Sequence, residues 1–139
     1  MHRTILLMFV ILGMLTGGCD NMVKGRSAAE AQVLIFHKQF NDTNFVAIVD
    51  SAHSDLFKTS PQPDFTNFLA VARRKLGKVT DSRAANWKVQ TFNGVTKVIL
   101  IQETVFTDGV GTETFTFHIS NAKATLLGYN ITSRDMMMK

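Results

Sequence analysis

The dipeptide Asn93–Gly94 constrains the fold of this chain more than any other short feature. Asn-Gly is a preferred pair for a two-residue type I′ turn, because both positions need positive φ. The dipeptide separates Val79–Phe92 from Val95–Phe106, and both flanking segments are rich in residues that favour strands. The sequence therefore predicts an antiparallel hairpin in which Phe92 pairs with Val95.

Two later turn signals extend this hairpin into a sheet. Asp108–Gly111 precedes Thr112–Ile119, where apolar residues alternate with threonine and histidine, and Ser120–Lys123 precedes Ala124–Thr132. Together with the first hairpin, these segments predict a four-stranded antiparallel meander. The second hairpin is expected to centre on Gly109–Val110, which gives the cross-strand pairs Gln102 with Phe117 and Leu100 with Ile119.

The first half of the chain has helical periodicity. Ser27 and Glu30 fit a capping box, which predicts a helix that starts at Ser27. The apolar residues of this helix recur at three- and four-residue intervals: Ala29, Val33, Phe36 and Phe40. Asn41–Asn44 is expected to end this helix and to cap a second, shorter one.

A third helix is expected after a loop over residues 51–60. Pro61 and Pro63 disfavour helix until Asp64, which is a good N-cap, and Gly77 is well placed to end the helix. Three helices followed by four strands are typical of the α+β class. We expect the N-terminal helices to pack against a curved, four-stranded antiparallel sheet.

Strand alternation assigns side chains to the two faces of this sheet. Paired residues point to the same side, so one face gathers large apolar residues against the helices: Trp87, Val89, Val98, Leu100, Phe115, Phe117 and Ile119. Ile99, Ile101 and Val105 then lie on the opposite face, where a solvated sheet would be polar. This apolar strip predicts a surface for a homodimer or another protein partner. Coverage by the chain's own termini would account for the strip equally well.

Over residues 27–133, the order of elements resembles the cystatin-like and nuclear-transport-factor-like α+β folds. The resemblance implies a cone in which a curved sheet wraps a long helix. Enzymes of these folds use an aspartate, histidine or tyrosine inside the cone, but no motif here aligns with theirs, so no catalytic residue is assigned. Polar candidates for a pocket in the cone are His37, Gln102, Glu113 and Tyr129. For His37, a hydrogen-bonded position at the core margin is the alternative.

The N-terminus is typical of a secretory signal. Arg3 is followed by an uncharged run from Thr4 to Gly18, whose apolar part is shorter than the roughly 20 residues of a membrane-spanning helix. The run closes on Leu15-Thr16-Gly17-Gly18-Cys19, which resembles the bacterial lipobox. That resemblance implies a diacylglyceryl group on Cys19, the sole cysteine, and a partner in the lipid bilayer, into which the acyl chains insert.

The lipobox divides the chain into four parts. Residues 1–18 are expected to be a lipoprotein signal peptide, 19–26 a lipidated N-terminus and tether, 27–133 a single α+β domain and 134–139 a tail. An ordinary secretory signal, or a short N-terminal anchor left uncut, is the alternative. The expected location is the bacterial cell envelope, facing the periplasm or the cell exterior. Asp20 leaves the choice between inner and outer membrane open.

Charge and motif content restrict the chemistry. The net charge of +4 is mild and acidic residues are interspersed, so a nucleic-acid partner is not expected. No two histidines have the spacing of a metal site on one element, and the cysteine is assigned to lipid, so neither a metal nor a cofactor is expected. Nucleophile-elbow, phosphate-loop and dinucleotide motifs do not occur in the sequence.

These observations favour a membrane-tethered, non-catalytic module that binds a protein partner or a small ligand in the cell envelope. Two alternatives are left open. One is a small envelope enzyme that uses the polar residues of the cone, and the other is an inhibitor or immunity-type protein that blocks an incoming protein. A deep pocket that holds two of the polar candidates would favour the enzyme, whereas a filled cone would favour the binding module.

Overall fold

Four strands form an antiparallel meander in the order β1–β2–β3–β4. The computed structural model describes residues 17–139. The helices and strands have these bounds: α1 (Gly17–Asn41), α2 (Phe45–Ser51), α3 (Leu56–Thr59), α4 (Gln62–Leu76), β1 (Val79–Phe92), β2 (Val95–Phe106), β3 (Gly109–Ser120), β4 (Lys123–Thr132) and α5 (Arg134–Met138). The predicted α+β class and the meander are confirmed.

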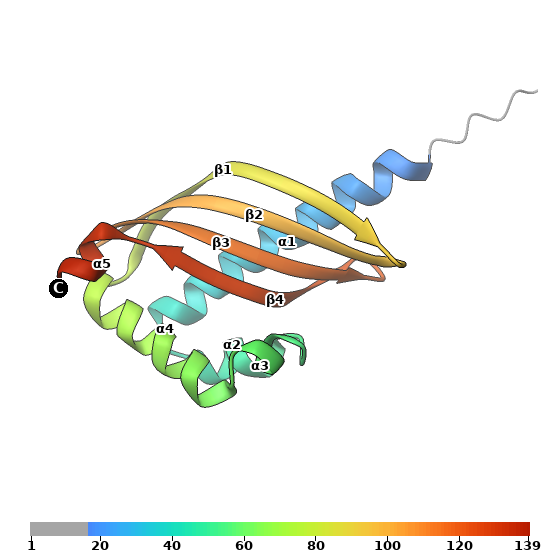
Figure 1. The fold of residues 1–139 in the computed structure, drawn as a ribbon. Coiled ribbons are helices and arrows are strands. Elements are labelled where there is room, and N and C mark those ends of the chain that lie inside the picture. The colour runs from blue at the N-terminus through green and yellow to red at the C-terminus, as the bar shows by residue number, and fades with distance from the viewer. Residues whose placement is uncertain (1–16) are drawn as a thin grey trace, which may run out of the picture.

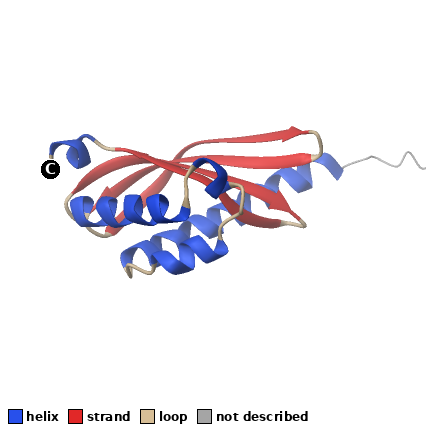
Figure 2. Ribbon diagram, turned by 60° about the horizontal axis from the view of Figure 1, so that its bottom comes forward, coloured by secondary structure: helices blue, strands red, loops and turns tan. Residues whose placement is uncertain are grey.

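The longer helices cover one face of the sheet, which we call the inner face; the opposite one is the outer face. Helix α1 runs along the length of the inner face and contacts all four strands (Figure 1). Figure 2 shows the helices gathered on one side of the sheet, with the short C-terminal helix at its end. A sheet that covers a long helix in this way is compatible with the cystatin-like fold. No helix between residues 17 and 139 is long and apolar enough to cross a membrane.

Helix α1 begins earlier than the sequence predicts. It starts at Gly17 rather than at Ser27, so residues 19–26, expected to be a tether, are helical. Gly25 is buried in this added part of the helix, and a Cβ on it would lie 3.7 Å from the side chains of Val98 and Ile119. The helix already packs on the sheet at this point. Residues 1–16 of the expected signal peptide lie outside the described residues.

The second and third expected helices are present, with one corrected boundary. Asn44 caps α2 by accepting a hydrogen bond from the Ala47 N–H, at 3.3 Å. Helix α4 begins at Gln62, before the predicted N-cap Asp64. Pro63 lies in its first turn, where the missing N–H has no intrahelical acceptor to lose.

Two short helices occur where none was predicted. Helix α3 lies within the expected loop 51–60, where Leu56 is buried in the core. Helix α5 replaces the expected tail 134–139, and the Ser133 side chain caps it by accepting from the Met136 N–H. Asp135 ties α5 to the sheet because its carboxylate accepts a hydrogen bond of 3.0 Å from the Val110 N–H.

The first hairpin has the predicted register. Phe92 pairs with Val95, and Trp87 pairs with Leu100. Asn93 and Gly94 have φ values of 49° and 75°, as a type I′ turn requires. The turn and the register predicted from Asn93–Gly94 are therefore confirmed.

The predicted register of the second hairpin is wrong. Its turn is Thr107–Asp108, so Leu100 pairs with Phe115 and Gln102 pairs with Glu113. The glycines that suggested a later turn lie in β3, where a neighbour approaches closely: a Cβ on Gly111 would lie 3.1 Å from Ile131. The shift is an even number of residues, so every side chain keeps its predicted face.

The core lies between the inner face and α1. Phe36 of α1 and Phe115 of β3 are both buried and meet edge to face, with ring centroids 5.0 Å apart. Such pairs add to the stability gained from burial. Gly77 ends α4 as predicted and has a φ of 80°; a Cβ there would lie 1.8 Å from Thr107 Oγ1. The core thus fills the space that a cone-type pocket would need.

Candidate functional site

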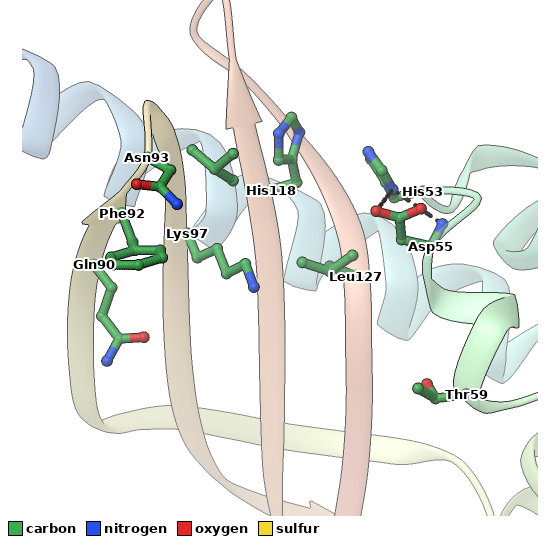
Figure 3. Close-up of a pocket in the computed structure, with 10 residues that line it drawn as sticks. His53, Asp55, Thr59, Gln90, Phe92, Asn93, Lys97, His118 and Leu127 are labelled. Carbon is green, nitrogen blue, oxygen red and sulfur yellow. Dashed lines mark hydrogen bonds and ion pairs between the residues drawn. The ribbon is translucent and has the colours of Figure 1, made fainter.

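A cleft with a volume of about 620 Å³ lies on the outer face, near the β1–β2 turn. Figure 3 shows side chains of all four strands and of the α2–α3 segment around it. Its lining residues are His53, Asp55, Thr59, Gln90, Phe92, Asn93, Val95, Lys97, His118 and Leu127. We call it the outer cleft.

Two local features of the chain build the wall of the outer cleft. The His53 N–H donates a hydrogen bond of 2.8 Å to the carbonyl oxygen of Leu126, which fixes the α2–α3 segment against the edge of β4. The pairing of β3 with β4 is interrupted between Thr116 and Phe117, and this irregularity leaves Leu127 without a partner. Because a bulge re-aims side chains, Leu127 reaches the cleft.

Two imidazoles lie side by side in this wall. The rings of His53 and His118 have centroids 4.7 Å apart and are inclined by 53°. His53 Nδ1 accepts a hydrogen bond of 3.1 Å from the Asp55 N–H, so the neutral ring carries its proton on Nε2. The hydrogen bond from Lys58 is the main reason that the pKa of the Asp55 carboxyl lies below its usual value.

The outer cleft combines basic and apolar groups with one carboxylate, that of Asp55. Lys97 and the two imidazoles supply hydrogen-bond donors, and Phe92 and Leu127 supply apolar surface. This combination suits a ligand group that is acidic at one end and apolar at the other. The sequence placed His118 on the outer face by alternation, but nothing in it indicated that His53 would lie beside His118.

The four polar residues predicted for the cone form or adjoin a buried network. Glu113 is 1% exposed and stands at its centre. Its Oε1 lies 2.7 Å from His37 Nε2 and accepts a hydrogen bond of 2.5 Å from the Thr104 hydroxyl. Its Oε2 accepts a hydrogen bond of 2.6 Å from the Tyr129 hydroxyl. Each carboxylate oxygen therefore has a partner, as a buried carboxylate requires.

The Tyr129 hydroxyl is held in its protonated, donating form. Burial raises the pKa of Tyr129 well above its usual value, and the charge of Glu113 and their hydrogen bond raise it further. Gln102 joins only indirectly: its Oε1 lies 3.3 Å from Ser82 Oγ, which lies 3.0 Å from Thr104 Oγ1.

His37, Gln102 and Glu113 are buried, and Tyr129 is partly buried. None of the best-defined clefts in the described part of the chain is lined by His37, Gln102, Glu113 or Tyr129. The structure therefore brings three of the predicted residues into direct contact, in a filled cone. Within the described side chains, no group of three His, Cys, Asp or Glu residues is arranged to hold a metal ion.

The predicted apolar strip lies on the outer face. Ile99 and Ile101 are partly exposed and Val105 is 43% exposed. Threonines of β3 stand beside the isoleucines, and Glu103, paired with Arg83, interrupts the strip. The long helices α1 and α4 lie on the other side of the sheet (Figure 2), away from this strip.

Comparison with protein-family models, with curated proteins and with solved structures finds no match for this chain.

Proposed function

We propose that this protein is a non-catalytic binding module, anchored in the bacterial cell envelope by lipid on Cys19, that presents the outer face of its sheet to a protein partner. The observation that carries the proposal is the contrast between the two faces. The polar groups of the inner face satisfy one another in a closed network. On the outer face, Ile99 and Ile101 are partly exposed and Val105 is 43% exposed, so a partner can reach them.

The anchor follows from the lipobox resemblance. Cys19 lies in α1, which continues without a break to Asn41. On this proposal a stiff helix, rather than a flexible tether, joins the lipid to the domain. The acyl chains insert in the bilayer, and the domain, of the cystatin-like type, faces the periplasm or the cell exterior. A Cys19→Ser variant is expected to leave the membrane fraction or to persist as an uncleaved precursor.

The partner is either a second copy of the chain or another envelope protein. Both share the membrane, so either is held at a high effective concentration near the outer face. An inhibitor of an incoming protein would use the same face. Exposed apolar side chains on a sheet often mark such contact surfaces.

A small envelope enzyme is the alternative, and the hydrogen-bonded trio of His37, Glu113 and Tyr129 favours it. Histidine and carboxylate in contact are a common acid–base pair. For catalysis a substrate has to reach them, which requires the core around Phe36 to open.

Site-specific photo-cross-linking in producing cells tests the binding proposal. A photoreactive residue at Ile99 or Ile101 is expected to form a covalent adduct, whereas the same residue at Asn67, exposed on α4, is the matched control. Adducts from Ile99 and Ile101 but not from Asn67 support the proposal. Adducts only from Leu34, an exposed residue of α1, would move the interface to the helical layer and contradict it.

A further inference from the structure

One end of the molecule carries several large apolar side chains exposed to solvent. The β1–β2 turn is flanked by Phe92, 77% exposed, and by Val95. The first described side chains of α1 include Val23, 65% exposed, and Met22. We call this region the hairpin end.

Helix α1 and the hairpin meet at this end. Arg26 lies over the Trp87 ring, 4.5 Å from its centroid, and Gly25 packs near Val98. From these contacts, α1 toward its N-terminus and β1 toward Phe92 lead to the same end of the molecule (Figure 1). The chain segment that contains Cys19 therefore leaves the domain at the hairpin end.

Five basic side chains and one acidic side chain of the described residues lie at the hairpin end, and the last turn of α4 carries a second basic group. The basic side chains of the hairpin end are Lys24, Arg26, Lys88, Lys97 and Lys123. Glu30 accompanies them and is bonded to Arg26 at 2.8 Å. The other described Lys, Arg, Asp and Glu side chains are equally divided between the two signs. The sequence did not indicate this grouping, because the five basic residues come from four separate elements.

We infer that the hairpin end rests on the surface of an anionic bilayer, with Phe92 and Val23 at the depth of the headgroups. The inference rests on the proposed function only for the lipid anchor at Cys19. Aromatic and aliphatic side chains beside lysines are the composition that favours the membrane interface. Each basic side chain near an anionic surface adds to the attraction.

With the hairpin end on the bilayer, the outer face of the sheet stands upright on the membrane. The strands lead away from the bilayer, so Ile99 and Ile101 face sideways, toward other proteins in the same membrane. The outer cleft, which Phe92 and Lys97 line, opens beside the headgroups. Lipid on Cys19 alone would leave the domain free to turn, whereas contact at the hairpin end fixes its orientation.

Tryptophan fluorescence of the full chain in vesicles tests this contact. Trp87 is the sole tryptophan, so Trp87→Phe gives a silent background into which one probe is introduced. Phe92→Trp places the probe at the hairpin end, and Met137→Trp places a matched, equally exposed control on α5 at the opposite end. Both proteins are purified in detergent and reconstituted in vesicles of phosphatidylcholine, with or without phosphatidylglycerol, whose acyl chains are brominated to quench tryptophan.

The Phe92→Trp protein is expected to lose most of its fluorescence in vesicles that contain phosphatidylglycerol, and the Met137→Trp protein is expected to lose little. Adding Lys24→Glu and Lys97→Glu to the first protein is expected to restore the signal. Equal quenching with and without phosphatidylglycerol would overturn the assignment to anionic headgroups. A cross-link between the hairpins of two copies, in place of quenching, would assign the surface to a second copy.

Flotation of the vesicles and mass spectrometry of Cys19 separate this inference from the anchor. An acylated chain that floats without quenching of the Phe92→Trp probe overturns the inference and leaves the anchor intact. Quenching in a chain that carries no lipid supports the inference and removes the anchor. A chain that does not float at all overturns both.

Discussion

The inner and outer faces of the sheet belong to the same four strands but differ in how far they bury their polar and apolar side chains. Glu113 points inward and is buried in hydrogen bonds, whereas Glu103 points outward and pairs with Arg83 in solvent. Leu100 is fully buried, whereas its neighbour Ile101 is partly exposed. Residue type alone therefore does not decide burial in this sheet. The layer of helices on one side decides it.

The largest expected difference in stability is between variants of Glu113 and Glu103, one glutamate from each face. Glu113→Leu is expected to lower the free energy of unfolding by about 3 kcal/mol or more, because His37, Thr104 and Tyr129 lose their acceptor in the core. Glu103→Leu is the matched control and should change it by about 1 kcal/mol at most, since exposed ion pairs contribute little. Urea unfolding measures both variants. Equal losses would show that the two faces do not differ.

Neighbouring aliphatic residues give the next comparison. Leu100→Ala is expected to cost about 3 kcal/mol, because it leaves a cavity between the sheet and α1. Ile101→Ala should cost about 1 kcal/mol or less, because its side chain already contacts solvent. The midpoints of urea unfolding compare the two variants. A larger loss at Ile101 would mean that a partner or a terminus covers the outer face in solution.

Alkaline pH tests the buried phenol. Because the pKa of Tyr129 is raised in the folded protein, its contribution to stability is complete below pH 10, the usual value, and is lost as the pH rises above it. The loss is expected to reach about 1.4 kcal/mol per pH unit in that range. Tyr129→Phe should remove this dependence while other residues titrate as before. The difference in free energy of unfolding between wild type and variant, measured from pH 8 to pH 11, should therefore shrink; a constant difference would argue against a buried hydroxyl.

The smallest effect is expected where the inner face is incompletely covered. Trp87 points inward but is 40% exposed, with Arg26 over its ring. Arg26→Gln is expected to cost about 0.5–1 kcal/mol by loss of the cation–π contact. Glu30→Gln keeps that contact and should cost less. Thermal unfolding of both variants is the check, and a greater loss for Glu30→Gln would show that the ion pair, not the ring, holds Arg26.

The sequence by itself determined the features that depend on neighbouring residues. Asn93–Gly94 specified its turn because few residue pairs adopt positive φ twice, and Gly77 ended its helix for the same steric reason. The period of two along each strand placed Leu100 inward and Ile101 outward. These faces are correct although the predicted register of β2 with β3 is wrong, because the predicted and observed registers differ by an even number of residues.

Only the tertiary structure decided what meets across the molecule. His37 and Glu113 are 76 residues apart, and neither carries a local signal for the other. Helix α1 continues N-terminally past the capping box at Ser27, and in this added part Gly25 packs near Val98 and Ile119 of the sheet. Backbone turns are governed by sterics within a few residues, whereas burial, hydrogen-bonded networks and the gathering of charge at the hairpin end depend on which distant segments pack together.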